Sequence, residues 1–101
     1  MSIDIRCYTT LQANDLQKKL DVFSSRNTKV FPEHYVLYRA QELGLFDKEI
    51  SNEYGLDPNS FFRMSVSNKR LDISTDAMAD MIRKELGSDN VIVLLNGEDL
   101  I

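Results

Sequence analysis

The stretch "SFFRMSVS", residues 60–67, decides how the middle of this chain folds. Apolar residues occupy every second position from Phe62 to Val66, and a period of two is typical of a β-strand with one buried face. The stretch also contains three serines, and serine is a poor residue for a helix interior. We therefore interpret residues 60–67 as a strand.

The N-terminal part of the chain predicts a strand followed by a helix. In "IDIRCYT", residues 3–9, one side carries Ile3, Ile5 and Cys7, and the other carries Asp4, Arg6 and Tyr8. This alternation predicts a strand with one buried face. Residues 9–27 then place apolar residues at helical spacing, namely Ala13, Leu16, Leu20 and Phe23.

The C-terminal part contains the same two elements in reverse order. Residues 74–87 form a predicted helix, which Ser74 or Thr75 can cap and Gly87 can end. The following "NVIVLLNG", residues 90–97, is short, apolar and β-branched, so we expect a buried strand there. The chain thus begins with a strand and a helix and finishes with a helix and a strand.

Residues 33–43 allow two interpretations. Pro32 before them and Gly44 after them are the usual residues at the start and the end of a helix. The segment "HYVLYRA", residues 34–40, is however rich in β-formers. If it is a strand beside residues 60–67, the chain follows the order β-α-β-β-α-β, the ferredoxin-like two-layer α+β sandwich. Residues 1–101 then form a single domain with an acidic insertion between the two inner strands.

The alternative is a central helix-turn-helix flanked by the two terminal strand and helix pairs. Residues 47–64, "DKEISNEYGLDPNSFFRM", resemble the repressor-type helix-turn-helix motif. The anchor, small residue and turn would be Ile50, Ser51 and Gly55, and the second helix would be anchored by Leu56, Phe61 and Met64. The resemblance implies a regulator that binds nucleic acid.

Charge argues against that alternative. The chain carries a net charge of −4, and between residues 41 and 59 five acids face one base, Lys48, so the whole imbalance lies in this segment. DNA binding depends strongly on cations that neutralise phosphates. An acidic segment at the groove would oppose it, so we do not expect nucleic acid as the partner.

The sequence contains no recognised catalytic motif and no residues at metal-ligand spacing. His34 is the one histidine and has no cysteine or second histidine near it. Cys7 lies on the apolar face of the first strand, where we expect an inert small hydrophobe. We therefore predict no enzyme activity, no cofactor and no metal site.

The confined acidic charge instead predicts a small protein-interaction module, of the inhibitor or immunity type, whose partner is another protein with a basic surface. Opposite charges on two proteins speed their encounter and disfavour wrong partners. We expect an exposed aromatic, Tyr54, to anchor the contact. The predicted partner-binding residues are Glu42, Asp47, Glu49, Glu53, Tyr54 and Asp57.

The sequence also predicts where the protein works. The longest apolar run, Val91–Leu95, is far shorter than the roughly 20 residues that span a bilayer. The N-terminus lacks the basic and apolar regions of a signal peptide. With a single cysteine, no internal disulfide can form. We expect a cytoplasmic protein without a membrane contact, and an uncovered sheet face would allow a homodimer, although no feature requires one.

Overall fold

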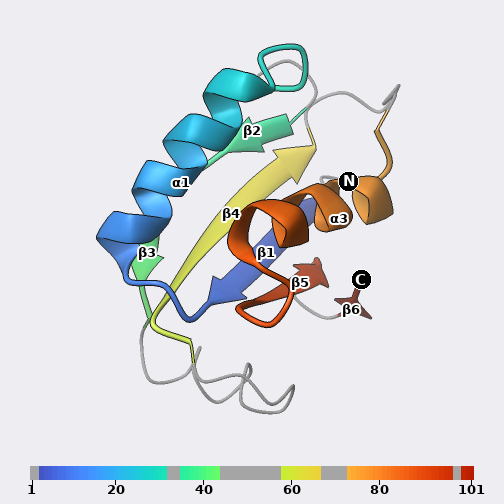
Figure 1. Cartoon of the computed structure of the whole chain (residues 1–101). Helices are drawn as coiled ribbons and strands as arrows, with labels where there is room; N and C mark the ends of the chain where they lie inside the picture. The colour runs from blue at the N-terminus through green and yellow to red at the C-terminus, as the bar shows by residue number, and fades with distance from the viewer. Residues whose placement is uncertain (1–2, 32–34, 44–57, 67–72, 97–98) are drawn as a thin grey trace.

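The structure, a computed structural model, describes residues 3–31, 35–43, 58–66, 73–96 and 99–101. Within them, strands and helices follow one another in the order β1, α1, β2, β3, β4, α3, β5, β6 (Figure 1). The helices are α1 (Ala13–Arg26) and α3 (Thr75–Leu86). The strands are β1 (Asp4–Thr9), β2 (Tyr35–Leu37), β3 (Gln41–Glu42), β4 (Ser60–Val66), β5 (Val91–Leu95) and β6 (Asp99–Leu100).

All pairs of neighbouring strands are antiparallel. The order across the sheet is β2-β4-β1-β5-β6, and β3 pairs with β4 as well. β4 pairs with β1 over six residues, from Thr9 opposite Ser60 to Asp4 opposite Ser65. The predicted α+β architecture with an antiparallel sheet and two helices is confirmed for the described residues.

Residues 60–66 form strand β4, as the alternation in the sequence predicts. Its side chains alternate in burial: Phe62 and Met64 are fully buried, whereas Phe61 and Arg63 on the other face are half-buried. The helix-turn-helix alternative is therefore wrong, because its second helix would need these residues to be helical. The first helix of that motif falls on residues 47–54, which lie outside the described residues.

The second inner strand differs from the prediction. We expected one strand over residues 34–40, with a helix over residues 33–43 as the alternative. The structure has two short strands, β2 and β3, separated by residues 38–40. Both pair with the same side of β4, β2 near Met64 and β3 near Ser60.

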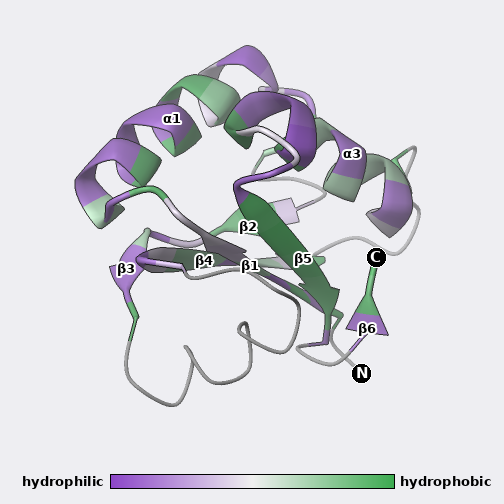
Figure 2. Cartoon of the chain, turned by 60° about the horizontal axis from the view of Figure 1, so that its bottom comes forward, coloured by the Kyte–Doolittle hydropathy of each residue, from purple (hydrophilic) through white to green (hydrophobic). Residues whose placement is uncertain are grey.

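Helices α1 and α3 lie side by side on one face of the sheet (Figure 2). The main core forms between the helices and that face. It joins Leu16 and Leu20 of α1, Met78 and Ile82 of α3, and sheet residues that include Ile5, Cys7, Phe62, Met64 and Val93. Burial of apolar side chains is the main favourable term in folding, so this layer holds the two terminal strand and helix pairs together.

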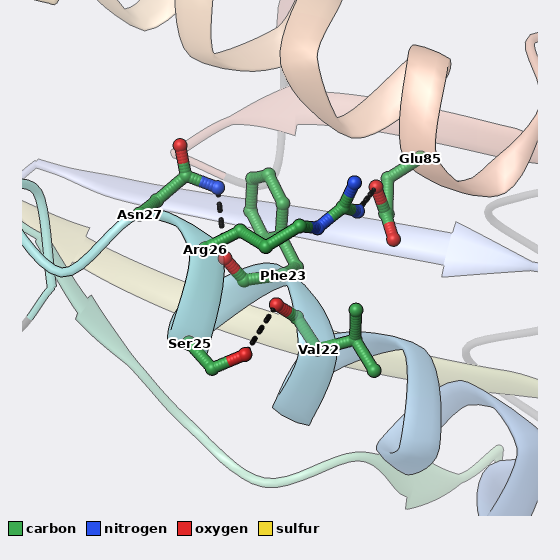
Figure 3. Close-up of polar contacts among 6 residues, drawn as sticks. All are labelled: Val22, Phe23, Ser25, Arg26, Asn27 and Glu85. Carbon is green, nitrogen blue, oxygen red and sulfur yellow. Dashed lines mark hydrogen bonds and ion pairs between the residues drawn. The ribbon is translucent and has the colours of Figure 1, made fainter.

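The helix ends follow the sequence. Ser74 caps α3 by accepting a hydrogen bond from the Ala77 N–H at 3.1 Å, and Gly87 ends it with a φ of 93°, a left-handed value that glycine adopts at no steric cost. At the end of α1, the Asn27 side chain donates to the Phe23 carbonyl at 2.8 Å (Figure 3). Arg26 beside it forms an ion pair with Glu85 of α3, which links the two helices (Figure 3).

The prediction that β1 buries only one of its faces is wrong at Tyr8. It was assigned to the outer face with Asp4 and Arg6, yet its side chain is 1% exposed. It forms a second, smaller cluster with Ile92 and Leu94 of β5, against which Leu43 and Phe61 pack. The rings of Tyr8 and Phe61 lie 6.0 Å apart. The sheet is therefore apolar on both faces at this end, although Arg6 and Arg63 also lie on the outer face.

Candidate partner-binding surface

One of the six predicted partner-binding residues lies within the described residues. Glu42 is the second residue of β3, and its side chain is exposed. The other predicted residues fall on residues 44–57, which lie outside the described part of the chain: Asp47, Glu49, Glu53, Tyr54 and Asp57. Their role remains a prediction.

The two ends of the acidic segment are held side by side. In the pairing of β3 with β4, Gln41 lies opposite Phe61 and Glu42 opposite Ser60. Residues 43–59 therefore leave the sheet and return to it at one place. The pairing thus fixes the two points between which residues 43–59 run.

Hydrogen bonds fix the C-terminal end of the segment to the connection between β1 and α1. Asn59 donates from its backbone N–H to the Thr9 carbonyl and from its side chain to the Thr10 carbonyl, both at 2.8 Å. The fully buried Ser60 hydroxyl donates to the Leu11 carbonyl at 2.6 Å. This end is thereby anchored to the core, since Thr9 is also fully buried.

The N-terminal end is held by helix α1. The side-chain oxygen of Gln17 accepts a hydrogen bond from the Ala40 N–H at 2.8 Å. The side-chain nitrogen of Gln17 donates to Asp21 at 2.9 Å, which orients the amide. β3 therefore begins directly after a residue that is tied to the helix layer.

A group of polar and aromatic residues next to β3 was not predicted. Arg6 of β1 and Arg63 of β4 lie opposite each other in the strand pairing. Together with Tyr38, Gln41 and Phe61 they line a shallow pocket of about 260 Å³ on the sheet face away from the helices. The alternation of β1 and β4 places each arginine on this face, but the sequence alone does not give the register that makes them neighbours.

The family comparison gives the biological class of the chain. The family described as CDI System Immunity Component matches residues 1–99. The chain belongs to this family. As a CDI immunity component, it is an immunity-type protein-interaction module, which confirms the class of function expected from the confined acidic charge.

Two relatives agree with this assignment. Immunity protein CdiI-2 of Burkholderia pseudomallei (strain 1026b) is 28% identical to this immunity component over 69 residues, which cover 68% of each chain. A chain in the CdiA-CT/CdiI toxin and immunity complex from Burkholderia pseudomallei has a TM-score of 0.90 at 20% identity. That match covers 97% of this chain and 95% of the other, and it supports the fold.

The one cysteine of this immunity component lies in β1. Cys7 is fully buried, and burial raises the pKa of its thiol, although the positive charge of Arg83 partly opposes the rise. A protonated, buried thiol is a poor nucleophile. The described residues include no group of three His, Cys, Asp or Glu side chains that could hold a metal ion. His34 lies outside them.

Tyr35 of β2 is a second buried group. Burial raises the pKa of its hydroxyl, which donates a hydrogen bond to the Ile73 carbonyl at 3.0 Å. This contact joins β2 to the start of α3, so we assign Tyr35 a structural role. Among the described residues, neither helix is long and apolar enough to cross a membrane.

Proposed function

We propose that this immunity component neutralises a toxin protein by binding it, and that residues 41–59 contact a basic surface of that toxin. The supporting observation is that the whole net charge of the chain lies in a segment whose two ends are paired through β3 and β4. Such a segment offers a concentrated negative surface on a fixed base. The contacting residues are the predicted set: Glu42, Asp47, Glu49, Glu53, Tyr54 and Asp57.

Electrostatic attraction would act mainly on the rate of encounter. Five acids and one base between residues 41 and 59 attract a cationic surface over roughly 8 Å at physiological salt. The exposed side chain of Glu42 supports this role, since it is available at the base of the segment.

Three further features belong to the proposal. The immunity component acts by binding and not as an enzyme, which the buried and protonated Cys7 supports. It works in the cytoplasm, where a single buried thiol stays reduced. Self-association stays a prediction.

The fold itself is proposed to be the ferredoxin-like arrangement with β3 and β6 added at its edges. The strand order β2-β4-β1-β5 supports this. In that order, α1 connects β1 to β2 across β4, and α3 connects β4 to β5 across β1, as in two interleaved βαβ units.

The test replaces Glu49 and Glu53 with lysine and measures binding to the purified toxin. We expect the association rate at low salt to fall about tenfold, because steering by complementary charge raises association rates by 10-fold or more. The matched control is Asp89→Lys with Asp99→Lys, which changes the net charge equally at two exposed positions outside the segment. An equal slowing in both variants, or none in the first, would contradict the role of the segment.

A cell assay tests neutralisation itself. Cells that produce the toxin should grow when they also produce the wild-type chain, and should grow poorly with the Glu49→Lys, Glu53→Lys variant. Growth arrest in the presence of the folded wild-type chain would refute the proposed function.

A further inference from the structure

Two arginines of like charge face each other on the outer side of the sheet. Arg6 and Arg63 are direct partners in the β1–β4 pairing, and both side chains are half-buried. Like charges directly opposite one another destabilise a sheet. An anion bound between the two guanidinium groups would relieve this repulsion.

Within the described part of the chain, no carboxylate forms an ion pair with either arginine. The ion pairs there join Arg26 to Glu85 and Arg83 to Asp80. Asp4 shares the outer face but accepts a hydrogen bond from the Ser65 hydroxyl at 3.1 Å. The described residues thus leave the two guanidinium groups available to a ligand.

Neighbouring side chains hold the pair in place. The guanidinium carbon of Arg63 lies 4.4 Å from the centre of the Tyr38 ring, within the range of a cation–π contact. The Tyr38 hydroxyl in turn lies 3.3 Å from Ser65 Oγ. An arginine positioned in this way loses less freedom when it binds a ligand, so the pocket of about 260 Å³ is prepared for an anionic group.

We propose that Arg6 and Arg63 together bind a carboxylate side chain of the toxin, at a second contact beside the acidic segment. This inference rests on the proposed function. Gln41 lines the pocket and precedes Glu42 in β3, so the basic pocket and the acidic segment adjoin. A partner that fits both must present a basic surface next to an acidic side chain, and such alternation fixes the orientation of the complex.

A protein carboxylate fits these observations better than the other anionic occupants. A nucleic acid would bring many phosphates close to a chain with a net charge of −4. A second copy packed face to face would bring two arginine pairs together. A single carboxylate matches the planar, two-pronged geometry of guanidinium groups and the small size of the pocket.

The test compares four variants in binding to the purified toxin: Arg6→Gln with Arg63→Gln, Arg6→Lys with Arg63→Lys, Arg39→Gln, and Glu49→Lys with Glu53→Lys. Arg39 is the matched control, because it is exposed and lines a groove beside α1 on the other side of the sheet. We expect the double glutamine variant to dissociate at least tenfold faster, because losing a hydrogen-bonded charge pair acts mainly on dissociation. The double lysine variant should lie between it and the wild type, and Arg39→Gln should stay within about twofold of the wild type.

Folding is checked by urea unfolding. The double glutamine variant should unfold with the slope of the wild type. The single variant Arg6→Gln should have a midpoint at or above that of the wild type, because it removes the repulsion between the arginines and keeps the contact of Arg63 with Tyr38. A lower midpoint would contradict the argument that the pair is unfavourable without its ligand.

The outcomes separate this inference from the proposed function. If the wild type does not bind the toxin, both fail. If the acidic variant binds slowly while the double glutamine variant dissociates like the wild type, the arginine site alone is refuted. A fluorescent single-stranded RNA that binds the wild type and not the double glutamine variant, with toxin binding unchanged, would also refute it. A change of mass by analytical ultracentrifugation in that variant would assign the pair to self-association instead.

Discussion

Ser60 connects the core to the base of the acidic segment, and its replacement by alanine tests how that base is held. The Ser60 side chain is fully buried, and its hydroxyl donates to the Leu11 carbonyl at 2.6 Å. The Leu11 N–H donates to Thr9 Oγ1 at 3.3 Å. Both backbone polar groups of Leu11, in the loop between β1 and α1, are thus hydrogen-bonded to side chains.

The expected loss of stability follows from the group left unpaired. Ser60→Ala removes the donor and leaves the part-buried Leu11 carbonyl without that partner. An unsatisfied buried polar group costs about 1–3 kcal/mol, and we expect about 2 kcal/mol here. A domain of this size is stable by roughly 5–15 kcal/mol, so the variant should remain folded and measurable.

Urea unfolding followed by circular dichroism measures this loss. With a slope of about 2 kcal/mol per molar urea, the midpoint should fall by about 1 M while the slope stays unchanged. Ser65→Ala is the control, because Ser65 lies in the same strand but is half-buried on the outer face. We expect it to lose less than about 1 kcal/mol, since water can replace its hydrogen bonds. An equal or larger loss in Ser65→Ala would refute the reasoning.

Two further predictions concern the core. Burial raises the pKa values of Cys7 and Tyr35 above their ordinary values of 9.0 and 10.0, so the unfolded chain releases these protons first and stability should decrease as the pH rises above about 9. Urea midpoints from pH 7 to 10 should therefore fall less in Cys7→Ala than in the wild type, and parallel curves would contradict this. Phe62→Ala should cost about 3–5 kcal/mol because Phe62 is fully buried, whereas the half-buried Phe61→Ala should cost about 1–2 kcal/mol, mostly from its contact with Tyr8. Equal losses in the two variants would contradict the alternation of β4.

The elements that the sequence predicted well are those whose pattern repeats locally. Strand β4 follows from the alternation of Phe62 and Met64, and helix α3 follows from its Ser74 cap and its Gly87 ending. These signals involve residues that lie only a few positions apart in the sequence. They can therefore be recognised without knowledge of the fold. The choice between a strand and a helix-turn-helix could be made because serines and β-formers disfavour a helix there.

The features that were missed depend on contacts between distant residues. Tyr8 was assigned to a polar face because it alternates with Asp4 and Arg6, yet Ile92 and Leu94 of β5 bury it. The pairing of Arg6 with Arg63 likewise requires the register of β1 on β4. A shift of one residue in the pairing of β1 with β4 would give each arginine a different partner. The pattern within a single strand does not determine this register.

The separation of core and surface residues explains how one fold can carry different surface charges. At 20% identity the matched Burkholderia pseudomallei chain keeps a TM-score of 0.90, because a core needs apolar residues of suitable size at the alternating positions and tolerates many combinations of them. Charged residues beside β3 are outside that requirement. We therefore expect specificity among immunity components to reside in the sign and register of charges such as Glu42 and Arg63, which can change without disturbing the layer of helices on the sheet.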